Sequence, residues 1–512
     1  MQFAFRREIF ALSLVLGMAG TKLAVADGDI HKVNHVVVIM QENHSFDNYF
    51  GALAYAPNSP YHNGNGGCSK TDHLCVDGLT ACTPDSTGNL TCANSNFDQH
   101  GNLVFSFHDT RRCVLPDLDH SWLFTHFENN YLNPNAGFRG TSDGFVRVNH
   151  LTEQPNDMQT MNFYTQDEIP FYYDLAQKFA LDDSYHAAVL GPTFPNRSYF
   201  MAATSFGHLT TSDTFPPTPT GYQPINGTIF DLMDNNHVSW ADYFQDAPQG
   251  GSFRLFNPPS GIDPHFAPLS VFLAQAAAGT LPQVSFVDPN FGLTGVATEN
   301  DEHPPTDIQR GQLYVSQVIN AVRNGPNWKD TVIFLTYDEH GGFYDHVLPP
   351  HANQGGAPTP DGIAPGQCAD LSNPPASLQP GGGAECSANP LSKTDTTLLD
   401  AELLCPQLAA NPTGPYPAQC ATFNQLGFRV PLLAISPFSK PAYVSHIIGD
   451  HTSLLAFIET RFLSPGNAQS RLHLTGRDEH AKPLLDMFDF NHSPSLNTVL
   501  TQAAPPVQDC TP

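Results

Sequence analysis

Short runs of apolar residues alternate along the chain with longer stretches in which apolar residues recur at helical spacing. Most of the short runs are continuously apolar, which is typical of strands in a parallel sheet that is covered on both faces. We predict strands at residues 33–40, 179–185, 237–244, 283–288, 331–337 and 428–436. We predict helices at residues 170–178, 227–235, 268–278, 307–323 and 452–463. This alternation predicts an α/β fold, a three-layer α/β/α sandwich around a mostly parallel sheet.

Two regions, residues 55–115 and 351–425, break this alternation. Both are rich in Gly, Pro, Asn and Ser, and together they hold nine of the ten cysteines. Because such a composition buries little apolar surface, we interpret them as loop insertions tied by disulfides. The segments with candidate chemistry are spread from residue 36 to residue 453 and would have to converge. We therefore expect residues 27–512 to form a single domain.

The first 26 residues have the features of an export signal. Arg6 and Arg7 precede an apolar run, and Ala24-Val25-Ala26 supplies a cleavage site of the A-x-A type. The apolar run is too short to span a membrane, and no later stretch is long and apolar enough. We expect a secreted or periplasmic protein with no transmembrane segment in the mature chain. The adjacent arginines leave the general secretory route and the twin-arginine route both open.

All ten cysteines follow this signal. An even number in an exported chain favours disulfides, and the absence of a CxxC pair argues against a zinc site built from thiolates. The region 55–115 holds an odd number of cysteines, so either one bond leaves the region or one thiol stays free. The sequence leaves the connectivity open.

The formal net charge of −27 over 512 residues argues against one class of function. A strongly acidic surface repels a phosphate backbone, so we expect no nucleic-acid partner. A small phosphate ester would still bind where a metal ion supplies local positive charge. The 23 histidines would gain charge below about pH 6.5, which is compatible with an acidic pH optimum.

Oxygen-bearing side chains follow two of the predicted strands. Glu42 and Asn43 come directly after the first predicted strand. Asp338 and Glu339 come directly after the fifth. In open α/β sheets, ligands bind beyond the carboxyl ends of the strands, and two adjacent carboxylates repel each other unless a cation lies between them. The pattern indicates a site for a divalent cation.

Thr193 occupies a third informative position, just ahead of a helix that we expect to start near Pro195. The free N–H groups at the start of a helix favour an anion. A threonine in this setting is often an ordinary helix cap, and the residues alone leave both roles open. Coordination of the hydroxyl to a divalent metal would lower its pKa and make it a usable nucleophile.

Three motifs connect these segments: QENHSFDNYFG at 41–51, TFPNR at 193–197 and DEHGGFYDH at 338–346. They resemble motifs of the bacterial phospholipase C/acid phosphatase (phosphoesterase) family in the alkaline phosphatase superfamily. The resemblance extends from about residue 33 to residue 490. It implies an alkaline phosphatase-like fold and one divalent metal ion, with Ca²⁺, Mg²⁺, Mn²⁺ and Zn²⁺ all open. The ligands that it implies are Glu42, Asn43, Thr193, Asp338 and Glu339.

The resemblance also implies catalytic roles. Thr193 would be the nucleophile and would form a phosphothreonine intermediate. His120 and His303 would hold phosphoryl oxygens and protonate the leaving alkoxide. His451 would be either a site residue or a helix cap. Four further residues are expected to orient the ligands and catalytic side chains without contacting the metal themselves: Asn196, Asp345, His346 and His451.

We predict a secreted, metal-dependent phosphoester hydrolase of the phospholipase C type, which cleaves a phosphodiester such as phosphatidylcholine. Several phospholipases C of this family carry additional C-terminal β-rich domains, whereas this chain stops soon after the catalytic region. An acid phosphatase that acts on monoesters is therefore the first alternative. A secreted binding protein on an inactive hydrolase fold is the second. The oligomeric state is open.

Overall fold

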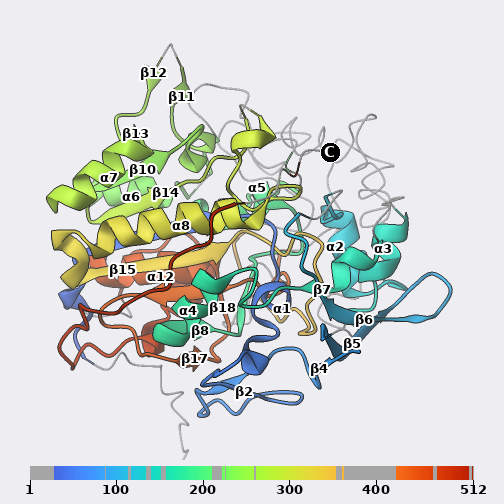
Figure 1. The fold of residues 1–512 in the computed structure, drawn as a ribbon. Coiled ribbons are helices and arrows are strands. Elements are labelled where there is room, and N and C mark those ends of the chain that lie inside the picture. Colours follow the sequence, from blue (N-terminus) through green and yellow to red (C-terminus); the bar gives the residue numbers. More distant parts are fainter. Residues whose placement is uncertain are drawn as a thin grey trace, which may run out of the picture.

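An eight-stranded sheet crosses the centre of the protein, with helices on both of its faces (Figure 1). The structure is a computed structural model, and it describes residues 28–86, 88–113, 117–133, 140–151, 157–209, 211, 222–224, 226–258, 261–293, 295–352, 360–362, 423–464, 470–506 and 510. The predicted export signal and most of the region 351–425 lie outside these residues.

The strand order in the central sheet is β13-β10-β14-β1-β15-β16-β8-β17. All neighbouring pairs are parallel except the two made by β16, which runs antiparallel to β15 and to β8. The prediction of a mostly parallel sheet is confirmed. The strands are β1 (His35–Gln41), β8 (Ala180–Asp182), β10 (Trp240–Phe244), β13 (Phe266–Pro268), β14 (Val284–Val287), β15 (Thr331–Tyr337), β16 (Leu432–Ile435) and β17 (Tyr443–Ser445).

Each of the six predicted strands overlaps with a strand of this sheet, and β15 has the predicted bounds. The stretch 179–185 divides into two strands. β8 joins the sheet, whereas β9 (Tyr185–His186) pairs with β18 (Gly449–Asp450) outside it. The edge strands β13 and β17 do not follow from the sequence, because runs of three residues carry too little periodic pattern.

Helices α4, α7 and α8 cover one face of the sheet, and α5, α6 and α12 cover the other (Figure 1). This is the predicted three-layer sandwich, and the five predicted helices agree with α4, α6, α7, α8 and α12 to within two residues at each end. None of the described helices combines the length and the apolar composition that crossing a membrane requires. The helices are α1 (Phe46–Phe50), α2 (Trp122–Asn129), α3 (Phe145–Leu151), α4 (Pro170–Lys178), α5 (Thr193–Ala202), α6 (Ile229–Asn235), α7 (Leu269–Ala278), α8 (Ile308–Arg323), α12 (His451–Phe462) and α13 (Gly476–His480).

Helix α8 and strand β15 both contribute to the hydrophobic core beside the centre of the sheet. Every residue of β15 is buried. Helix α8 starts at the N-cap Asp307, whose side chain accepts a hydrogen bond from the backbone N–H of Gln309. Val315, Val318 and Val322 recur at helical spacing and are fully buried. These side chains belong to the same hydrophobic core as the apolar residues of β15.

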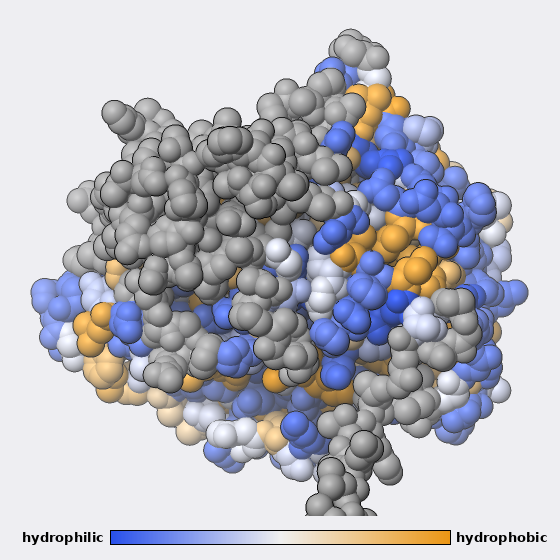
Figure 2. Space-filling model, turned by 180° about the vertical axis from the view of Figure 1, so that it is seen from behind, coloured by the Kyte–Doolittle hydropathy of each residue, from blue (hydrophilic) through white to orange (hydrophobic). Residues whose placement is uncertain are grey.

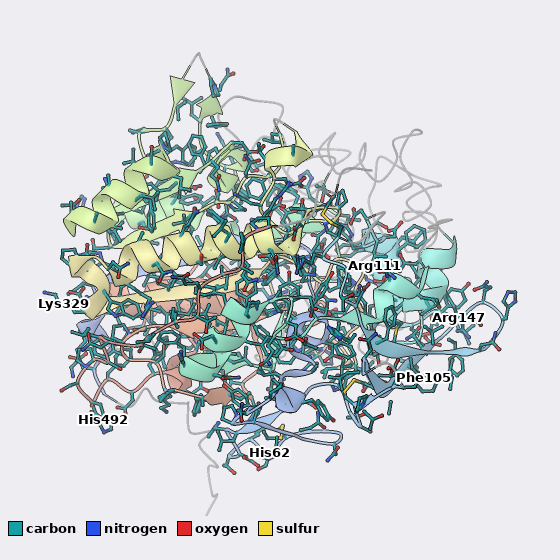
Figure 3. All side chains as sticks on the ribbon, viewed as in Figure 1. His62, Phe105, Arg111, Arg147, Lys329 and His492 are labelled. Atoms are coloured by element: carbon teal, nitrogen blue, oxygen red, sulfur yellow. A yellow bond between two sulfur atoms is a disulfide. The ribbon has the colours of Figure 1, made fainter. Side chains whose placement is uncertain are left out.

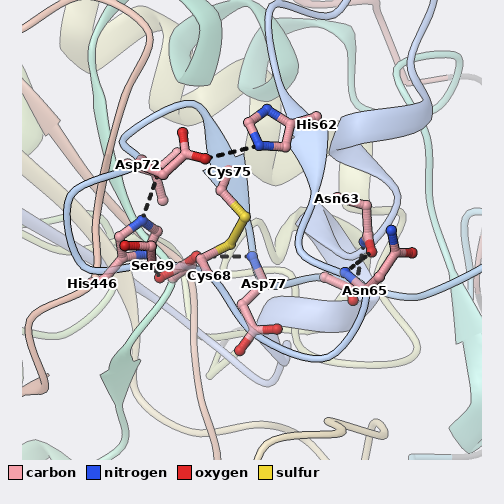
Figure 4. The surroundings of a disulfide bond; sticks show 12 residues. His62, Asn63, Asn65, Cys68, Ser69, Asp72, Cys75, Asp77 and His446 are labelled. Atoms are coloured by element: carbon pink, nitrogen blue, oxygen red, sulfur yellow. Dashed lines mark hydrogen bonds and ion pairs between the residues drawn. A yellow bond between two sulfur atoms is a disulfide. The ribbon is translucent and has the colours of Figure 1, made fainter.

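The region 55–115 forms one small sheet outside the central one and, together with β7, a second. Three disulfides involve it, and the bond that leaves it accounts for its odd number of cysteines. The prediction of disulfides is thus confirmed for the described cysteines, and the remaining four lie outside the described residues. The bonds are Cys68–Cys75 (Figure 4), Cys82–Cys92 and Cys113–Cys510. The strands are β2 (His62–Asn63), β3 (Cys75–Val76), β4 (Thr83–Pro84), β5 (Leu90–Phe97), β6 (Leu103–His108) and β7 (Asn162–Phe163).

Candidate functional site

Two polar segments leave the sheet at neighbouring strand ends. β1 and β15 are parallel neighbours, and their last residues, Gln41 and Tyr337, stand opposite each other. Asn43 lies two residues beyond β1, and its backbone N–H donates a hydrogen bond to Oδ1 of Asp338 over 3.3 Å. Asp338 is the first residue beyond β15. The sheet thus brings together the two acidic segments that the sequence pattern singles out.

The close approach of these segments requires glycine at position 341. Gly341 has a φ of +64°, and a Cβ there would lie 2.2 Å from the backbone oxygen of Asn43. Gly342 also has a positive φ, +72°. Only glycine adopts this conformation at little cost and leaves room for Asn43. The two glycines therefore allow the tight turn that follows β15.

Thr193 is the first residue of α5 and lines a cavity. We expected it just ahead of the helix, and this expectation is wrong by one residue. Pro192 is extended and occupies the N-cap position, so helical geometry begins directly after it. Pro192 has no side-chain group that could cap the helix, and the hydroxyl of Thr211 accepts a hydrogen bond from the backbone N–H of Phe194 over 3.3 Å. Thr193 is therefore not an ordinary helix cap, and its partly exposed side chain faces the cavity.

Asn196 fixes the segment that leads to Thr193. Its Oδ1 accepts a hydrogen bond from the backbone N–H of Val189 over 3.0 Å. Its Nδ2 donates to the backbone oxygens of Gly191 and Pro192 over 2.7 and 3.1 Å. The side chain is fully buried, so these bonds are shielded from water. Asn196 determines where the chain enters α5, and with it the position of Thr193.

Arg197 lies between the two acidic segments, and its role here does not follow from the sequence pattern. Its Nε is 3.2 Å from Oδ2 of Asp338, and its Nη2 is 3.1 Å from Oε1 of Glu42. Its Nη1 donates to Oε1 of Gln249 over 3.1 Å. Thr193 and Arg197 are four residues apart and share a face of α5. Arg197 therefore ties the helix of the predicted nucleophile to both strand ends.

The buried carboxylates at the two strand ends favour a second positive charge besides that of Arg197. Burial and the carboxylate of Glu42 raise the pKa of Asp338 to about 8, although Arg197 opposes the shift. Two buried oxygens, Oδ1 of Asn43 and Oε1 of Glu339, have no hydrogen-bond partner among the described residues. Oxygens without a donor, beside carboxylates that repel each other, are suited to coordinate a divalent ion. The residues fit the metal ion that the sequence implies.

His120 and His303 lie side by side at this site, with ring centroids 6.1 Å apart. Nε2 of His120 is 3.7 Å from Oε1 of Glu339. Burial alone would lower the pKa of His120, but Glu339 and Asp117 raise it to about 9. Burial is likewise outweighed at His303, where Asp117 and Glu42 raise the pKa to about 10. Both rings are protonated near neutral pH and can hold anionic oxygens.

His340 pairs with Glu339 and is itself paired with Glu128, and neither His340 nor Glu128 is among the predicted site residues. Nδ1 of His340 is 3.3 Å from Oε2 of Glu339, and Nε2 of His340 is 2.7 Å from Oε2 of Glu128. Burial raises the pKa of Glu339, but His120 and His340 outweigh it and keep the pKa below its usual range. His340 stands inside a quoted motif, whereas nothing in the sequence around Glu128 on α2 signals this contact.

Asp345 and His346 lie in an ion-pair cluster around Arg429. Nε of Arg429 is 2.9 Å from Oδ1 of Asp345. Nδ1 of His346 is 2.7 Å from Oδ2 of Asp47, which also pairs with Arg429 through its other oxygen. These contacts join the loop after β15 to α1. Support of the metal ligands by Asp345 and His346 stays a prediction.

His451 lies directly behind Asp338. Its Nε2 is 2.6 Å from the backbone oxygen of Asp338, and its Nδ1 is 3.2 Å from the hydroxyl of Tyr185. Burial lowers the pKa of His451 to about 4, so the ring is neutral and donates one N–H. Asp450 provides the N-cap of α12, so the alternative of His451 as a helix cap is wrong.

A cavity of about 630 Å³ opens beside Thr193. Glu42, Asp301 and His303 line its polar part. Its apolar part is built mainly from aromatic rings, which pack against apolar chains and against organic cations. The cavity therefore places an apolar wall next to the predicted nucleophile. The apolar residues that line it include Phe194, Met201, Phe253, Phe256, Phe291 and Leu293.

The chain is similar to known proteins along most of its length. A model described as the Phosphoesterase family matches residues 33–464. "Phospholipase C B" of Mycobacterium tuberculosis (strain ATCC 25618 / H37Rv) is 27% identical over 96% of this chain and 90% of its own. "Non-specific phospholipase C6" of Arabidopsis thaliana is 29% identical over 92% of this chain and 74% of its own. "Non-hemolytic phospholipase C" of Burkholderia pseudomallei (strain K96243) is 28% identical over 85% of this chain and 56% of its own.

Similarity to solved structures is much lower. A protein in the alkaline phosphatase superfamily from Vibrio parahaemolyticus aligns with a TM-score of 0.26 and 12% identity, over 57% of this chain and 59% of its own. The fold of this chain is defined by its own strand order and helix layers.

Proposed function

Because the chain belongs to the Phosphoesterase family, we propose that it is a phospholipase C-like enzyme that hydrolyses phosphate esters at Thr193. The position of Thr193 carries most weight. It begins α5 at the wall of a cavity that Glu42, Arg197 and His303 also line. The relatives are named phospholipases C, which supports a phospholipid phosphodiester as the substrate, and we take phosphatidylcholine as the example.

The residues of the chain take the following parts in the reaction. The deprotonated oxygen of Thr193 attacks phosphorus, and the bond to the leaving alkoxide breaks. His120 and His303 hold the phosphoryl oxygens, and one of them gives a proton to the alkoxide. Water then attacks the phosphothreonine, which releases the phosphorylated head group and returns a proton to the oxygen of Thr193. Asn196 keeps the nucleophile in place throughout, because it holds the segment before α5.

One divalent metal ion belongs to this proposal. When bound, it would add positive charge that lowers the pKa of a neighbouring hydroxyl and balances the phosphoryl group. Arg197 holds the carboxylates of Glu42 and Asp338 in place through its two ion pairs. The donors are all oxygens, a set that Ca²⁺, Mg²⁺ and Mn²⁺ prefer and that Zn²⁺ also accepts. The residues that would hold the ion are Glu42, Asn43, Thr193, Asp338 and Glu339.

A diester with a choline-type head group fits the charge of the protein better than a monoester. A diester carries one negative charge, whereas a phosphate monoester carries about two above pH 6. The formal charge of −27 therefore opposes the monoester more strongly. The aromatic wall of the cavity offers ring faces to a quaternary ammonium and apolar contact to a lipid chain.

Export completes the proposal. Residues 1–26 would direct the chain out of the cytoplasm and would then be removed. The three disulfides support this, because such bonds form and persist in oxidising compartments. The enzyme would then meet its substrate outside the cytoplasm.

Paired assays with and without a chelator test the proposed function. We expect a higher kcat/KM for a phosphocholine diester than for an aryl phosphate monoester between about pH 5 and 8. A chelator should abolish both activities, and added metal should restore them. If the monoester is preferred throughout, with an acid optimum, the protein is an acid phosphatase. If neither ester is cleaved in the presence of metal, a binding function replaces the enzymatic one.

A further inference from the structure

A β-hairpin with exposed apolar side chains stands near the mouth of the cavity. β11 (Phe256–Asn257) and β12 (Gly261–Ile262) form it, and Phe256 stands opposite Ile262. The hairpin projects from the body of the molecule (Figure 1), and its surface just below the tip is apolar (Figure 2). Leu255 is 36% exposed and Ile262 is 44% exposed, whereas Phe256 lines the cavity.

Arg254 holds the base of this hairpin in place. Its Nε is 3.0 Å from Oδ2 of Asp263. Its Nη1 is 3.1 Å from Oδ1 of Asp231, and its Nη2 is 2.7 Å from Oδ2 of Asp234. Both of these acids belong to α6. Because one guanidinium joins the hairpin to a helix of the outer layer, Leu255 and Ile262 are presented in a defined position.

Leu293 adds a third exposed apolar side chain, on another segment that lines the same cavity. It is 57% exposed. Its backbone N–H and that of Phe291 donate to the two carboxylate oxygens of Asp246 over 3.0 and 3.1 Å. The ring of Phe291 lies 5.0 Å from the guanidinium carbon of Arg197. Asp246 therefore fixes the segment that runs from the catalytic site to the exposed Leu293.

Apolar surface continues from the predicted nucleophile to these exposed positions. Phe194 follows Thr193, and its ring stacks with that of Phe253 at 6.4 Å between centroids. Phe253 and Phe256 line the cavity, and Phe256 begins the hairpin. An ester with its phosphorus at Thr193 could extend its apolar part along this wall to the outside of the molecule.

We propose that Leu255, Ile262 and Leu293, here called the apolar rim, insert into the surface of a zwitterionic lipid bilayer. This role rests on the proposed function, because a lipid substrate would lie in that surface. Exposed apolar groups at a binding site are typical of contacts with membranes or other partners, and apolar side chains at an interface bury themselves at the boundary of head groups and acyl chains. The net charge of −27 favours zwitterionic over anionic lipid, because like charges repel.

Vesicle binding tests the apolar rim without turnover. The mature chain with Thr193→Ala, mixed with phosphatidylcholine vesicles, should sediment with them. Adding Leu255→Ser and Ile262→Ser should weaken this binding by about tenfold, and adding Leu293→Ser should weaken it further. The matched control is Leu103→Ser with Phe105→Ser, at positions that are 49% and 46% exposed on β6, away from the β11–β12 hairpin (Figure 3). The control should change binding by less than about twofold.

Each outcome of this experiment decides for or against the apolar rim. No binding by the parent chain, equal binding by the rim variant, equal loss in the control or a preference for anionic vesicles would overturn it. With Thr193 present, the variant with Leu255→Ser and Ile262→Ser should cleave a soluble short-chain diester as fast as the unaltered chain, since neither residue lines the cavity. Failure of the unaltered chain to cleave any diester would contradict the proposed function, and vesicle binding would still decide on the rim.

Discussion

The backbone N–H of Asn43 donates a hydrogen bond to Oδ1 of Asp338, although the two residues are 295 positions apart in the chain. The contact exists because β1 and β15 are parallel neighbours that end at the same edge of the sheet. Gly341 leaves room for it, since a Cβ at this position would collide with Asn43. The oxygen donors thus follow directly after strands of the central sheet. A site anchored on regular elements is positioned more precisely than a site on a long loop.

Replacing Arg197 should show how much of the site depends on its two ion pairs. Arg197→Ala leaves the buried carboxylates of Glu42 and Asp338 uncompensated, so we expect a loss of about 3 to 5 kcal/mol in the free energy of unfolding. Arg197→Lys keeps the charge but not the forked geometry and should lose less. Denaturant unfolding of metal-free protein measures this. Added divalent metal should restore part of the loss, and an unchanged stability of Arg197→Ala would show that the ion pairs are dispensable.

Asn196→Ala should impair catalysis more than binding. Without the three hydrogen bonds to Val189, Gly191 and Pro192, the segment before α5 loses its fixed position. We expect kcat to fall by about 10- to 100-fold with little change in KM. Asn236→Ala is the control, because Asn236 is exposed at the end of α6 and bonds only to its own helix among the described residues. A raised KM with an unchanged kcat would contradict the positioning role.

Glu302 gives the protein a pH-dependent stability. It is fully buried, and the hydroxyls of Tyr49 and Tyr337 donate to it over 2.6 and 2.7 Å, with a further hydrogen bond from Tyr172. Burial raises the pKa of Glu302 from 4.5 to about 7, although the tyrosine hydroxyls oppose the shift. Because the folded-state pKa is the higher one, the stability contribution is fully present below about pH 4.5 and is lost as the pH rises towards 7.

Glu302→Gln should remove this dependence, because glutamine stays neutral at every pH. Between about pH 4.5 and 7, the unaltered chain should lose about 3 kcal/mol more of its free energy of unfolding than the variant. Unfolding measured at several pH values decides this. Glu479→Gln, at a side chain that is 48% exposed, is the control and should leave the curve unchanged. If the free energy of unfolding changes with pH in the same way for Glu302→Gln and the unaltered chain, Glu302 is not the source of the pH dependence.

The disulfides can be tested independently of activity. Non-reducing peptide mapping of the mature protein should recover Cys68–Cys75, Cys82–Cys92 and Cys113–Cys510. The last bond joins residues 397 positions apart, so replacing both of its cysteines by serine should cost about 2 to 4 kcal/mol. Mostly free thiols would refute these pairings and the inference of export.

Much of the fold follows from the sequence, and β15 shows why. Its seven residues form an uninterrupted run of apolar, aromatic and β-branched side chains, and the run stops at Asp338. A strand buried on both faces ends where charged residues begin, so the position of the acids can be predicted together with the strand. The antiparallel direction of β16 cannot be predicted, because the apolar pattern of a strand does not indicate whether it runs parallel or antiparallel to its neighbour.

The site is less predictable than the sheet, because its supporting contacts join distant segments. Arg197 belongs to a quoted motif, but its partners Glu42 and Asp338 become evident only when α5 packs against the strand ends. Glu128 supports His340 from α2, and no local pattern marks it. Helix α5 includes Thr193, which we expected just ahead of the helix, because the ends of helices depend on caps and packing more than on periodicity.

Phosphorylation of Thr193 during turnover is the most direct measurement of the proposed chemistry. The protein is mixed with a phosphodiester, quenched in acid during the first turnovers, digested and mapped by mass spectrometry. We expect phosphate on the peptide that contains Thr193. Thr193→Ala should keep its metal by elemental analysis but lose at least about 10³-fold in kcat, whereas Asp338→Asn should lose both metal and activity. Phosphate on a different residue, or full activity of Thr193→Ala, would contradict the account.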